Sequence, residues 1–364
     1  MIREIQIDNF KSIPSLNMEL GRFNVLIGAN GCGKSNILEA IAMGSAAAEN
    51  KLDNPILFNR GIRLPNAPLM RSAFTDTKTK EAIGIKFITD QNTFILTLDN
   101  GNEFNSNWEI NVELQKETLK EAVEDYIKNG KSEKNTKILL QKLTPKTSAD
   151  IINFFIYAPE NQLLRRFEDE EKGRVLGVRG EGLFPILQLI IQENPEKFKE
   201  IKAHLSLFDW FEDVEIPHDL FMSEKRLKIT DAYLQDGLKT FDQKSANEGF
   251  LYLLFYLTLF ISNYTPKFFA IDNIDNALNP KLGSELISIL SKLAVKYDKQ
   301  VILTTHNPAI LDGLDLSDDE QRLFVISRNK SGHTKALRVP DKERNTRLSE
   351  SFIRGYIGGL PKNF

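Results

Sequence analysis

The sequence predicts an α/β fold with a mixed or parallel sheet core and a helical insertion subdomain. Two observations support this prediction. After about residue 241, short apolar strands such as "KFFAID" and "QVILTTH" alternate with helical segments, a pattern typical of parallel sheets buried on both faces. Near the N-terminus, the strand "RFNVLI" runs directly into a glycine-rich turn and a helix. We therefore expect one core that is built from both ends of the chain.

The first 110 residues form the predicted N-terminal half of this core. "IREIQIDNF" alternates apolar and polar residues, as a half-buried strand does. After "RFNVLI" and the glycine-rich turn, "SNILEAIAMGSAAA" has the pattern of a helix. "AIGIKFITDQNTFILTLDNG" predicts a hairpin that turns at "TDQN".

Residues 111–240 form the predicted insertion, and residues 241–364 the second half of the core. Residues 118–146 are rich in lysine and glutamate with sparse apolar periodicity, which indicates exposed helices. "INFFIYAPE" is a further strand candidate. "EGLFPILQLIIQENPEKFKEIKAHLSLF" predicts two helices divided at Asn194 and Pro195, because proline is favoured at the first helical position.

Composition restricts the protein class. The 364 residues are 41% hydrophobic and carry a net charge of -3, so no large DNA-wrapping surface is implied, although a local basic patch is compatible with these values. Cys32 is the single cysteine, which excludes an internal disulfide and favours a reducing compartment. The longest apolar run, "FLYLLFYLTLFI", fits a buried helix and is too short to span a bilayer. We expect a soluble, cytoplasmic protein that does not enter a membrane.

"GANGCGKS" (residues 28–35) fits the spacing G-x-x-x-x-G-K-[ST] between a strand and a helix, the context in which it forms a phosphate-binding loop. Its glycines let backbone N–H groups turn toward phosphate oxygens, and the helix N-terminus adds a favourable dipole. Lys34 would reach the β- and γ-phosphates, and the Ser35 hydroxyl would bind Mg²⁺. The alternative is a glycine turn with a chance lysine. The expected nucleotide contacts in this loop are Asn30, Gly31, Cys32, Gly33, Lys34 and Ser35.

Two strand ends in the second half of the core carry further candidates. Asp272 ends "FFAID" and would hold the magnesium ion, unless it only caps a helix. His306 ends "VILTTH" and could bind the γ-phosphate or the attacking water, because ligands of open α/β sheets lie at the carboxyl ends of the strands. A strand-terminal histidine in a polar cluster is the alternative.

A third candidate is the turn "SANEGF", which places Asn247 and Gly249 before the buried helix. Such a turn could bind a phosphate presented from outside. Taken by itself, it is better explained as an ordinary helix cap.

With these segments in this order, the sequence resembles the ABC-type ATPase superfamily. It is most similar to the RecF/SMC-like branch of AAA family ATPases, which includes overcoming-lysogenization-defect proteins and many anti-phage ATPases. The resemblance rests on "IDNFKSI", "GANGCGKS", "NEGFLYLLFYLTLF", "IDNIDNALNP", "LTTHNP", "ENPEKFKEIKAHLSLF" and the terminal "IRGYIGGLP". The signature-like segment departs from the family, with Asn247 for the usual serine and Phe250 for threonine. No glutamine stands clearly at the Q-loop position.

The resemblance implies a site composed of two chains. In this family two copies enclose two ATP molecules with Mg²⁺, and each phosphate loop faces the partner's signature segment. Asn247 and Gly249 would then contact the γ-phosphate bound to the other copy, and "NALN" (residues 276–279) would link the two sites. The expected assembly is a homodimer or larger.

Asn273 stands where the family has the glutamate that acts as the general base. Asparagine can orient water but cannot accept a proton at neutral pH, and losing a general base typically costs roughly 10²–10⁴ in rate. Three outcomes follow: a slow, long-lived ATP-bound clamp, which we favour; use of Asp275 as the base; or hydrolysis that requires a group from a partner.

Three functions compete. The first is an ATP-binding sensor and scaffold for a separate effector, such as a nuclease, in anti-phage defence; about 58 residues follow His306, too few for the nuclease domain of larger relatives. The second is a DNA-repair or chromosome-maintenance ATPase of the RecF/SMC type. The lysine-rich stretch of residues 128–146 is the best evidence for it. A transporter motor subunit is disfavoured by the degenerate signature.

Overall fold

The computed structural model describes residues 1–75, 81–101, 107–115, 151–167, 176–217, 225–341 and 346–359. The helices predicted over residues 118–146 lie outside this range, as does the lysine-rich stretch 128–146. Among the described residues, no helix combines the length and apolar character needed to cross a bilayer.

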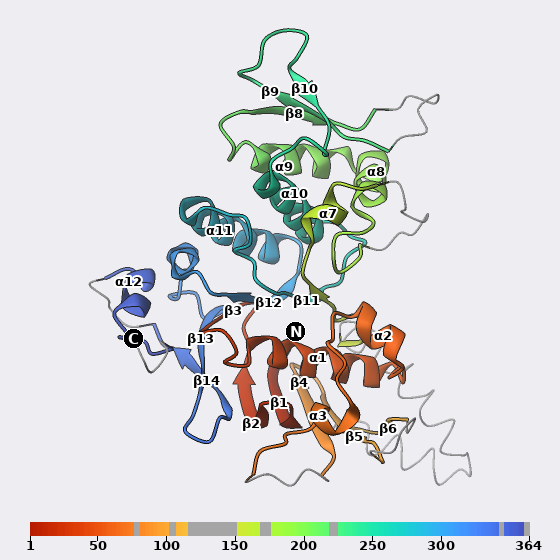
Figure 1. Cartoon of the computed structure of the whole chain (residues 1–364), viewed down its shortest axis with the longest axis vertical. Coiled ribbons are helices and arrows are strands. Elements are labelled where there is room, and N and C mark those ends of the chain that lie inside the picture. Colours follow the sequence, from red (N-terminus) through yellow and green to blue (C-terminus); the bar gives the residue numbers. More distant parts are fainter. Residues whose placement is uncertain are drawn as a thin grey trace.

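A six-stranded sheet forms the centre of the molecule (Figure 1). Five of its strands are parallel, and β14 at one edge is antiparallel. This confirms the predicted α/β class with a mixed, largely parallel core. The strands, in spatial order, are β14 (Thr334–Val339), β13 (Gln321–Arg328), β3 (Phe23–Ile27), β12 (Gln300–Thr305), β11 (Phe268–Ile271) and β7 (Ile156–Tyr157).

A second, five-stranded antiparallel sheet is built from the N-terminal part of the chain. Its β4–β5 pair is the predicted hairpin, with a turn closed by the Thr89 N–H to the Asn92 carbonyl at 2.8 Å. Its strands, in spatial order, are β2 (Ile13–Glu19), β1 (Ile2–Phe10), β4 (Ile83–Thr89), β5 (Thr93–Asp99) and β6 (Glu109–Gln115). Helix α1 (Lys34–Ala48) lies between the two sheets, and its apolar residues share one core with both (Figure 1). The short helices α2 (Asn54–Asn59) and α3 (Ala67–Met70) follow α1.

The opposite face of the six-stranded sheet is covered by α10 (Glu248–Ile261) and α11 (Pro280–Lys296). Every residue of α10 after Glu248 is buried, which confirms the prediction of a core helix rather than a membrane segment. The 3₁₀ helix η1 (Pro308–Gly313) packs on α11, and α12 (Leu348–Ile353) packs on η1.

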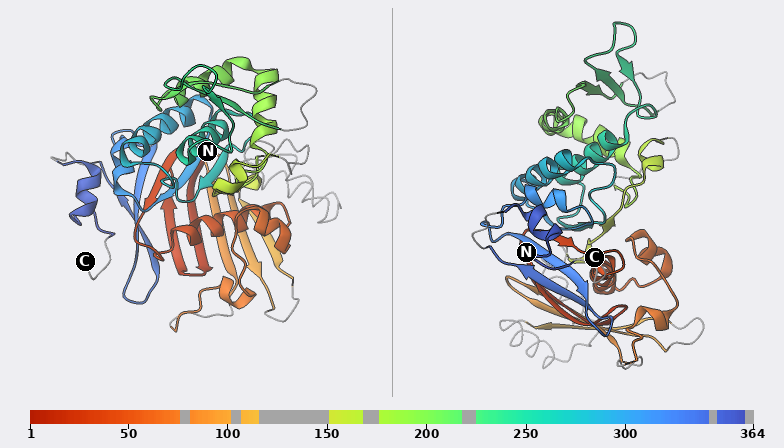
Figure 2. Two further views of the ribbon diagram at one scale, coloured as in Figure 1. Left: turned by 45° about the horizontal axis from the view of Figure 1, so that its top comes forward. Right: turned by 60° about the vertical axis from the view of Figure 1, so that its left-hand side comes forward.

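The segment between β7 and α10 forms a lobe that projects from the two-sheet body (Figure 2). It contains α7 (Asn161–Leu164), α8 (Leu183–Glu193) and α9 (Pro195–Leu205), and the last two are the predicted helices divided at Asn194 and Pro195. A three-stranded sheet that the sequence did not predict closes the lobe: β8 (Phe211–Glu215), β9 (Lys228–Asp231) and β10 (Thr240–Phe241). Its strands are short and show only weak alternation of apolar and polar residues, so the hydrophobic periodicity of the sequence does not indicate them.

A buried lysine fixes the turn that leads into β11. Lys299 is 1% exposed, and its Nζ donates to the carbonyl oxygens of Ser262, Thr265 and Pro266 at 3.0 Å each. These bonds satisfy carbonyl groups that would otherwise be buried without partners. The clamp therefore holds the entry to β11, whose other end carries Asp272.

Candidate phosphate-binding site

The glycine-rich loop joins β3 to α1 and is too tightly packed for larger residues at two positions. A Cβ atom at Gly28 would lie 2.1 Å from the Ile326 carbonyl oxygen. Gly33 has a φ of 109°, and its Cβ would lie 2.1 Å from Thr334 Oγ1. Because α1 begins at Lys34, the free N–H groups of its first turn face the loop.

Two hydroxyl groups brace this loop from outside. Thr334 Oγ1 donates to the Cys32 carbonyl oxygen at 2.9 Å and lies 2.7 Å from Ser12 Oγ. Ser12 Oγ also accepts from Asn36 Nδ2 at 2.7 Å, so the β1–β2 turn and β14 both hold the start of α1. Sequence reasoning missed Thr334, because it lies 302 residues from Cys32 and no local pattern marks it.

Lys34 folds back into the loop. Its Nζ donates to the Gly28 carbonyl oxygen at 2.7 Å and lies 3.1 Å from His306 Nδ1. Burial lowers the pKa of Lys34, while nearby negative groups, including Asp272 and Asp275, oppose that shift. Burial, followed by the charge of Lys34, lowers the pKa of His306, so its ring is neutral at pH 7 and its Nδ1 accepts from Lys34.

Asp272 lies at the carboxyl end of β11 and accepts two hydroxyl hydrogen bonds. Ser35 Oγ donates to Oδ2 at 3.0 Å, and Thr304 Oγ1 donates to Oδ1. The structure thus brings Lys34, Ser35, Asp272 and His306 together from three different segments. Thr304 was not predicted, although threonine at the carboxyl end of a strand beside a ligand site is a signal that could have identified it.

The loop that follows Asp272 holds the two residues considered for proton transfer. Asn273 has a φ of 55°, and its N–H donates to Thr304 Oγ1 at 2.9 Å. The negative charge of Asp275 acts to raise the pKa values of both Lys34 and His306, against the larger effect of burial. Its Oδ1 is buried, with no hydrogen-bond partner in the part of the chain that the structure describes.

Asn247 and Gly249 lie apart from this cluster within one chain. Asn247 is the N-cap of α10, and its Oδ1 accepts from the Phe250 N–H at 2.8 Å, which is the helix-cap arrangement. Gly249 packs against residues 277 and 278, where an added Cβ would lie 3.1 Å from the Ala277 carbonyl oxygen. The exposed Asn247 thus remains available to a second molecule.

The residues fit a nucleoside triphosphate and a magnesium ion. The loop, the α1 N-terminus and Lys34 supply donors for phosphate oxygens, while Asn30 and Gly31 are exposed at its rim. Ser35 and Asp272 supply an adjacent hydroxyl and carboxylate, the oxygen ligands that Mg²⁺ prefers. No group of three His, Cys, Asp or Glu side chains suited to a metal occurs among the described residues, and Mg²⁺ bound through phosphates needs only one or two protein ligands.

A cleft of about 710 Å³ adjoins the Ser35 and Asp272 side chains. Glu39 lies on its wall, 1% exposed, and forms ion pairs with Lys11 and Arg63 at 2.5 Å each. Neither Glu39 nor its partners were candidates from the sequence, because a charged residue within a helical pattern reads as surface-exposed.

Residues 23–312 match the family described as "AAA domain, putative AbiEii toxin, Type IV TA system". The chain belongs to this family. A segment of 121 residues is 35% identical to the "Uncharacterized protein MJECL10" of Methanocaldococcus jannaschii, and this match covers 32% of our chain. The chain spans about half of that relative's length (54%).

Two solved structures share the fold of this chain. One is an SmcHead bound to the C-winged helix domain of ScpA, with a TM-score of 0.59 at 15% identity, covering 93% of this chain and 97% of that one. The other is an Smc head domain with an extended coiled coil, bound to a ScpA domain derived from Pyrococcus furiosus, with a TM-score of 0.55 at 12% identity and coverages of 98% and 99%. The predicted ABC-type ATPase fold is confirmed, while the anti-phage branch stays a prediction.

We expect ATP binding to depend on Lys34. Replacing Lys34 by alanine removes the cation nearest the loop carbonyl groups, so calorimetry with magnesium should show affinity reduced by at least roughly tenfold. Lys292→Ala, which removes an exposed lysine of α11, is the matched control and should bind as the parent does. Equal affinity in Lys34→Ala and the parent would contradict the role of the loop.

Proposed function

We propose that the protein binds ATP with Mg²⁺, hydrolyses it slowly, and serves as a sensor and scaffold for a separate effector in anti-phage defence. The observation that carries the nucleotide part is the convergence of Lys34, Ser35, Asp272 and His306 at the carboxyl ends of β3, β11 and β12. Membership of an AAA family with a nucleotide-binding loop supports it.

Each residue of the cluster has a distinct part in binding. Lys34 exchanges its bonds to loop carbonyl groups for the β- and γ-phosphates. Ser35 and Asp272 would hold Mg²⁺, which would supply neutralisation of the phosphate charge. His306, neutral because its pKa is lowered, offers a ring nitrogen to the γ-phosphate or to the attacking water.

The active assembly that we propose contains two chains enclosing two nucleotides. Asn247 and Gly249 lie at the N-terminus of α10 and beside the loop of residues 276–279, rather than at the glycine-rich loop of their own chain. A facing copy would present this helix N-terminus to the γ-phosphate, where backbone N–H groups bind anions.

We expect ATP to drive dimerisation. Light scattering with a non-hydrolysable ATP analogue should show dimers or larger species, because the nucleotide then supplies contacts to both chains. Under the same conditions, Lys34→Ala should keep the oligomeric state that it has without nucleotide. Monomers at every concentration, with the analogue bound, would refute the two-chain site.

We also expect slow hydrolysis, because Asn273 cannot accept a proton. Asn273→Glu should raise phosphate release, with a gain that could approach roughly 10²–10⁴. Asn273→Gln is the matched control, since it has the length of glutamate without the proton acceptor, and it should stay at or below the parental rate. If glutamine raises the rate as much as glutamate, the missing base is not what limits hydrolysis.

The defence role rests on the family and on how related folds assemble. The family description names a toxin and a toxin–antitoxin system, which supports a function in cell defence. Both Smc heads were solved with a separate ScpA domain bound, and we infer by analogy that this head also acts through another protein. Co-expression with neighbouring genes and capture of the tagged chain should recover one effector, such as a nuclease, in an ATP-dependent complex.

The Smc-like fold favours one second candidate, a chromosome-maintenance or DNA-repair ATPase. The same capture experiment separates the two. ATP-dependent recovery of DNA without a protein partner would support this candidate, and a phage-challenge assay without any protection would argue against defence.

A further inference from the structure

The turn that leads into α10 is held by an arginine from another part of the chain. Arg165, the C-cap residue of α7, donates from Nη1 to the carbonyl oxygens of Gln243 and Lys244 at 3.1 and 2.8 Å. Its Nε donates to Asn161 Oδ1 at 2.7 Å, which fixes the plane of the guanidinium group. Hydrogen bonds from a charged donor are about twice as strong as those between neutral groups. Arg165 therefore connects α7 firmly to this turn.

The same turn is shaped by its own aspartate. Asp242 Oδ1 accepts from the N–H groups of Lys244 and Ser245 at 3.0 and 3.3 Å, as aspartate does in tight turns. The aspartate binds N–H groups of the turn, whereas Arg165 binds its carbonyl groups. Asn247 follows directly as the N-cap of α10. Both sets of bonds therefore restrict the direction in which this helix begins.

The segment that carries Arg165 is attached at its other end to the candidate magnesium site. Tyr157 of β7 pairs with Ile271 of β11, and its carbonyl oxygen accepts from the Asp272 N–H at 2.8 Å. Residues 157–165 thus begin at the carboxylate of the chain's own site and end at the turn before α10. One short stretch of chain is bonded to both places.

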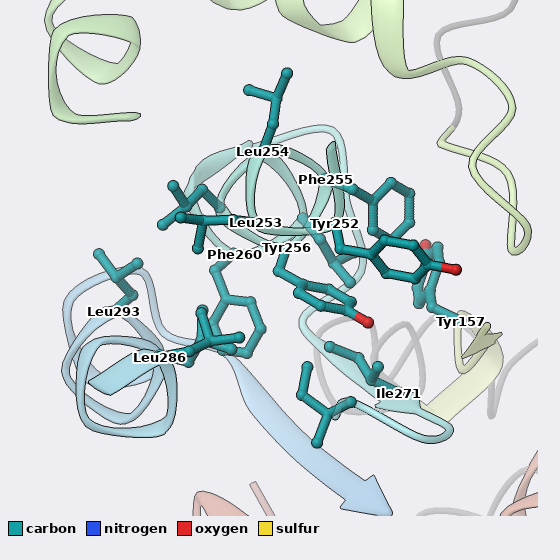
Figure 3. Packing of buried hydrophobic residues seen from close by; sticks show 14 of the residues in the cluster. Tyr157, Tyr252, Leu253, Leu254, Phe255, Tyr256, Phe260, Ile271, Leu286 and Leu293 are labelled. Carbon is teal, nitrogen blue, oxygen red and sulfur yellow. The ribbon is translucent and has the colours of Figure 1, made fainter. Parts of the chain in front are cut away.

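The middle of this segment packs directly on α10. The Tyr252 hydroxyl donates to the Pro159 carbonyl oxygen at 3.0 Å. The ring centroids of Tyr157 and Phe255 lie 6.0 Å apart, and Figure 3 shows Tyr252 and Phe255 projecting from α10 on the side of Tyr157. These contacts hold the body of the helix, whereas Arg165 holds the turn at its N-terminus.

We propose that Arg165 is a positioning residue for the nucleotide site of the facing copy. By holding the carbonyl groups of residues 243 and 244, it directs Asn247 and the α10 N-terminus toward the γ-phosphate bound to the second chain. Arg165 acts on that nucleotide only through the turn. The inference rests on the proposed function, because it needs a site made of two chains. It concerns their association and is independent of how fast ATP is hydrolysed.

Arg165→Ala should weaken ATP-driven dimerisation without weakening ATP binding to one chain. With a non-hydrolysable ATP analogue and Mg²⁺, sedimentation should show a dimer dissociation constant raised by at least roughly tenfold, because charge-assisted bonds to each turn are lost. A fluorescent ATP analogue, titrated at protein concentrations where the parent is monomeric, should bind Arg165→Ala and the parent equally. Arg165→Lys keeps the charge without the planar fork, so its dissociation constant should lie between those two.

Arg166→Ala is the matched control. It removes the same charge from the next residue, whose side chain is exposed, and should dimerise as the parent does. A parental dissociation constant in Arg165→Ala would overturn the proposal and leave the two-chain site standing. A parent that stays monomeric with the analogue bound would instead refute the two-chain site.

Mixed dimers separate an effect on the facing site from general damage to the fold. A Lys34→Ala chain keeps its turn but lacks the cation of its phosphate-binding loop, so a dimer with a parental chain has one complete site, on the parental loop. Arg165→Ala on the ATP-binding chain should leave this mixed dimer unchanged, because the altered turn then faces the impaired loop. On the Lys34→Ala chain, it should raise the dissociation constant by roughly tenfold.

Sedimentation of a fluorescently tagged Lys34→Ala chain follows the mixed dimers alone. The two placements contain the same substitution and differ only in the chain that carries it. A loss confined to the Lys34→Ala chain supports action on the facing site. Equal loss in both placements would show that Arg165 acts on the fold or on its own nucleotide, and would overturn the proposal.

Discussion

The two hydroxyl hydrogen bonds that Asp272 accepts connect the segments on which the whole site depends. Ser35 belongs to α1, Thr304 to β12 and Asp272 to the end of β11. These groups meet because β3, β12 and β11 are parallel neighbours whose carboxyl ends coincide, with Ile27 opposite Thr305 and Ile271 opposite Leu303. A register shift by one residue would turn each side chain to the other face of the sheet and separate all three.

The phosphate-binding loop has a second attachment, through hydroxyl groups of the β1–β2 turn and of β14. Ser12 and Thr334 brace the start of α1, so the phosphate-binding loop is held between the two sheets rather than by one of them. On the remaining side, α10 packs against the loop after Asp272. The candidate site is therefore a junction of three layers, and a movement of α10 relative to the sheets would act directly on Ala277 and Leu278 of that loop.

Much of this arrangement could be predicted from local sequence. The glycine-rich loop, the apolar strand ending at Asp272 and the helix after Pro280 all carry short-range signals, because turn chemistry and helix caps act over a few residues. The role of Thr334 could not be predicted, since it depends on contacts between segments far apart in the sequence, whereas the position of Thr304 at the end of a strand was a usable signal. The three-stranded sheet of the lobe was missed because its strands, such as Thr240–Phe241, are too short to show a period.

The position of β3 has a consequence for how the polypeptide is made. All strands of the antiparallel sheet lie within the first 115 residues, so this layer can form early during translation. β3 emerges with them, but its sheet neighbours are β12 and β13, which begin about 280 and 300 residues later. At about 5–20 residues per second, a ribosome needs roughly 15–60 s to supply them. For that time an apolar strand and the loop attached to it have no sheet to join, so the newborn chain would benefit from a chaperone until its last third is synthesised.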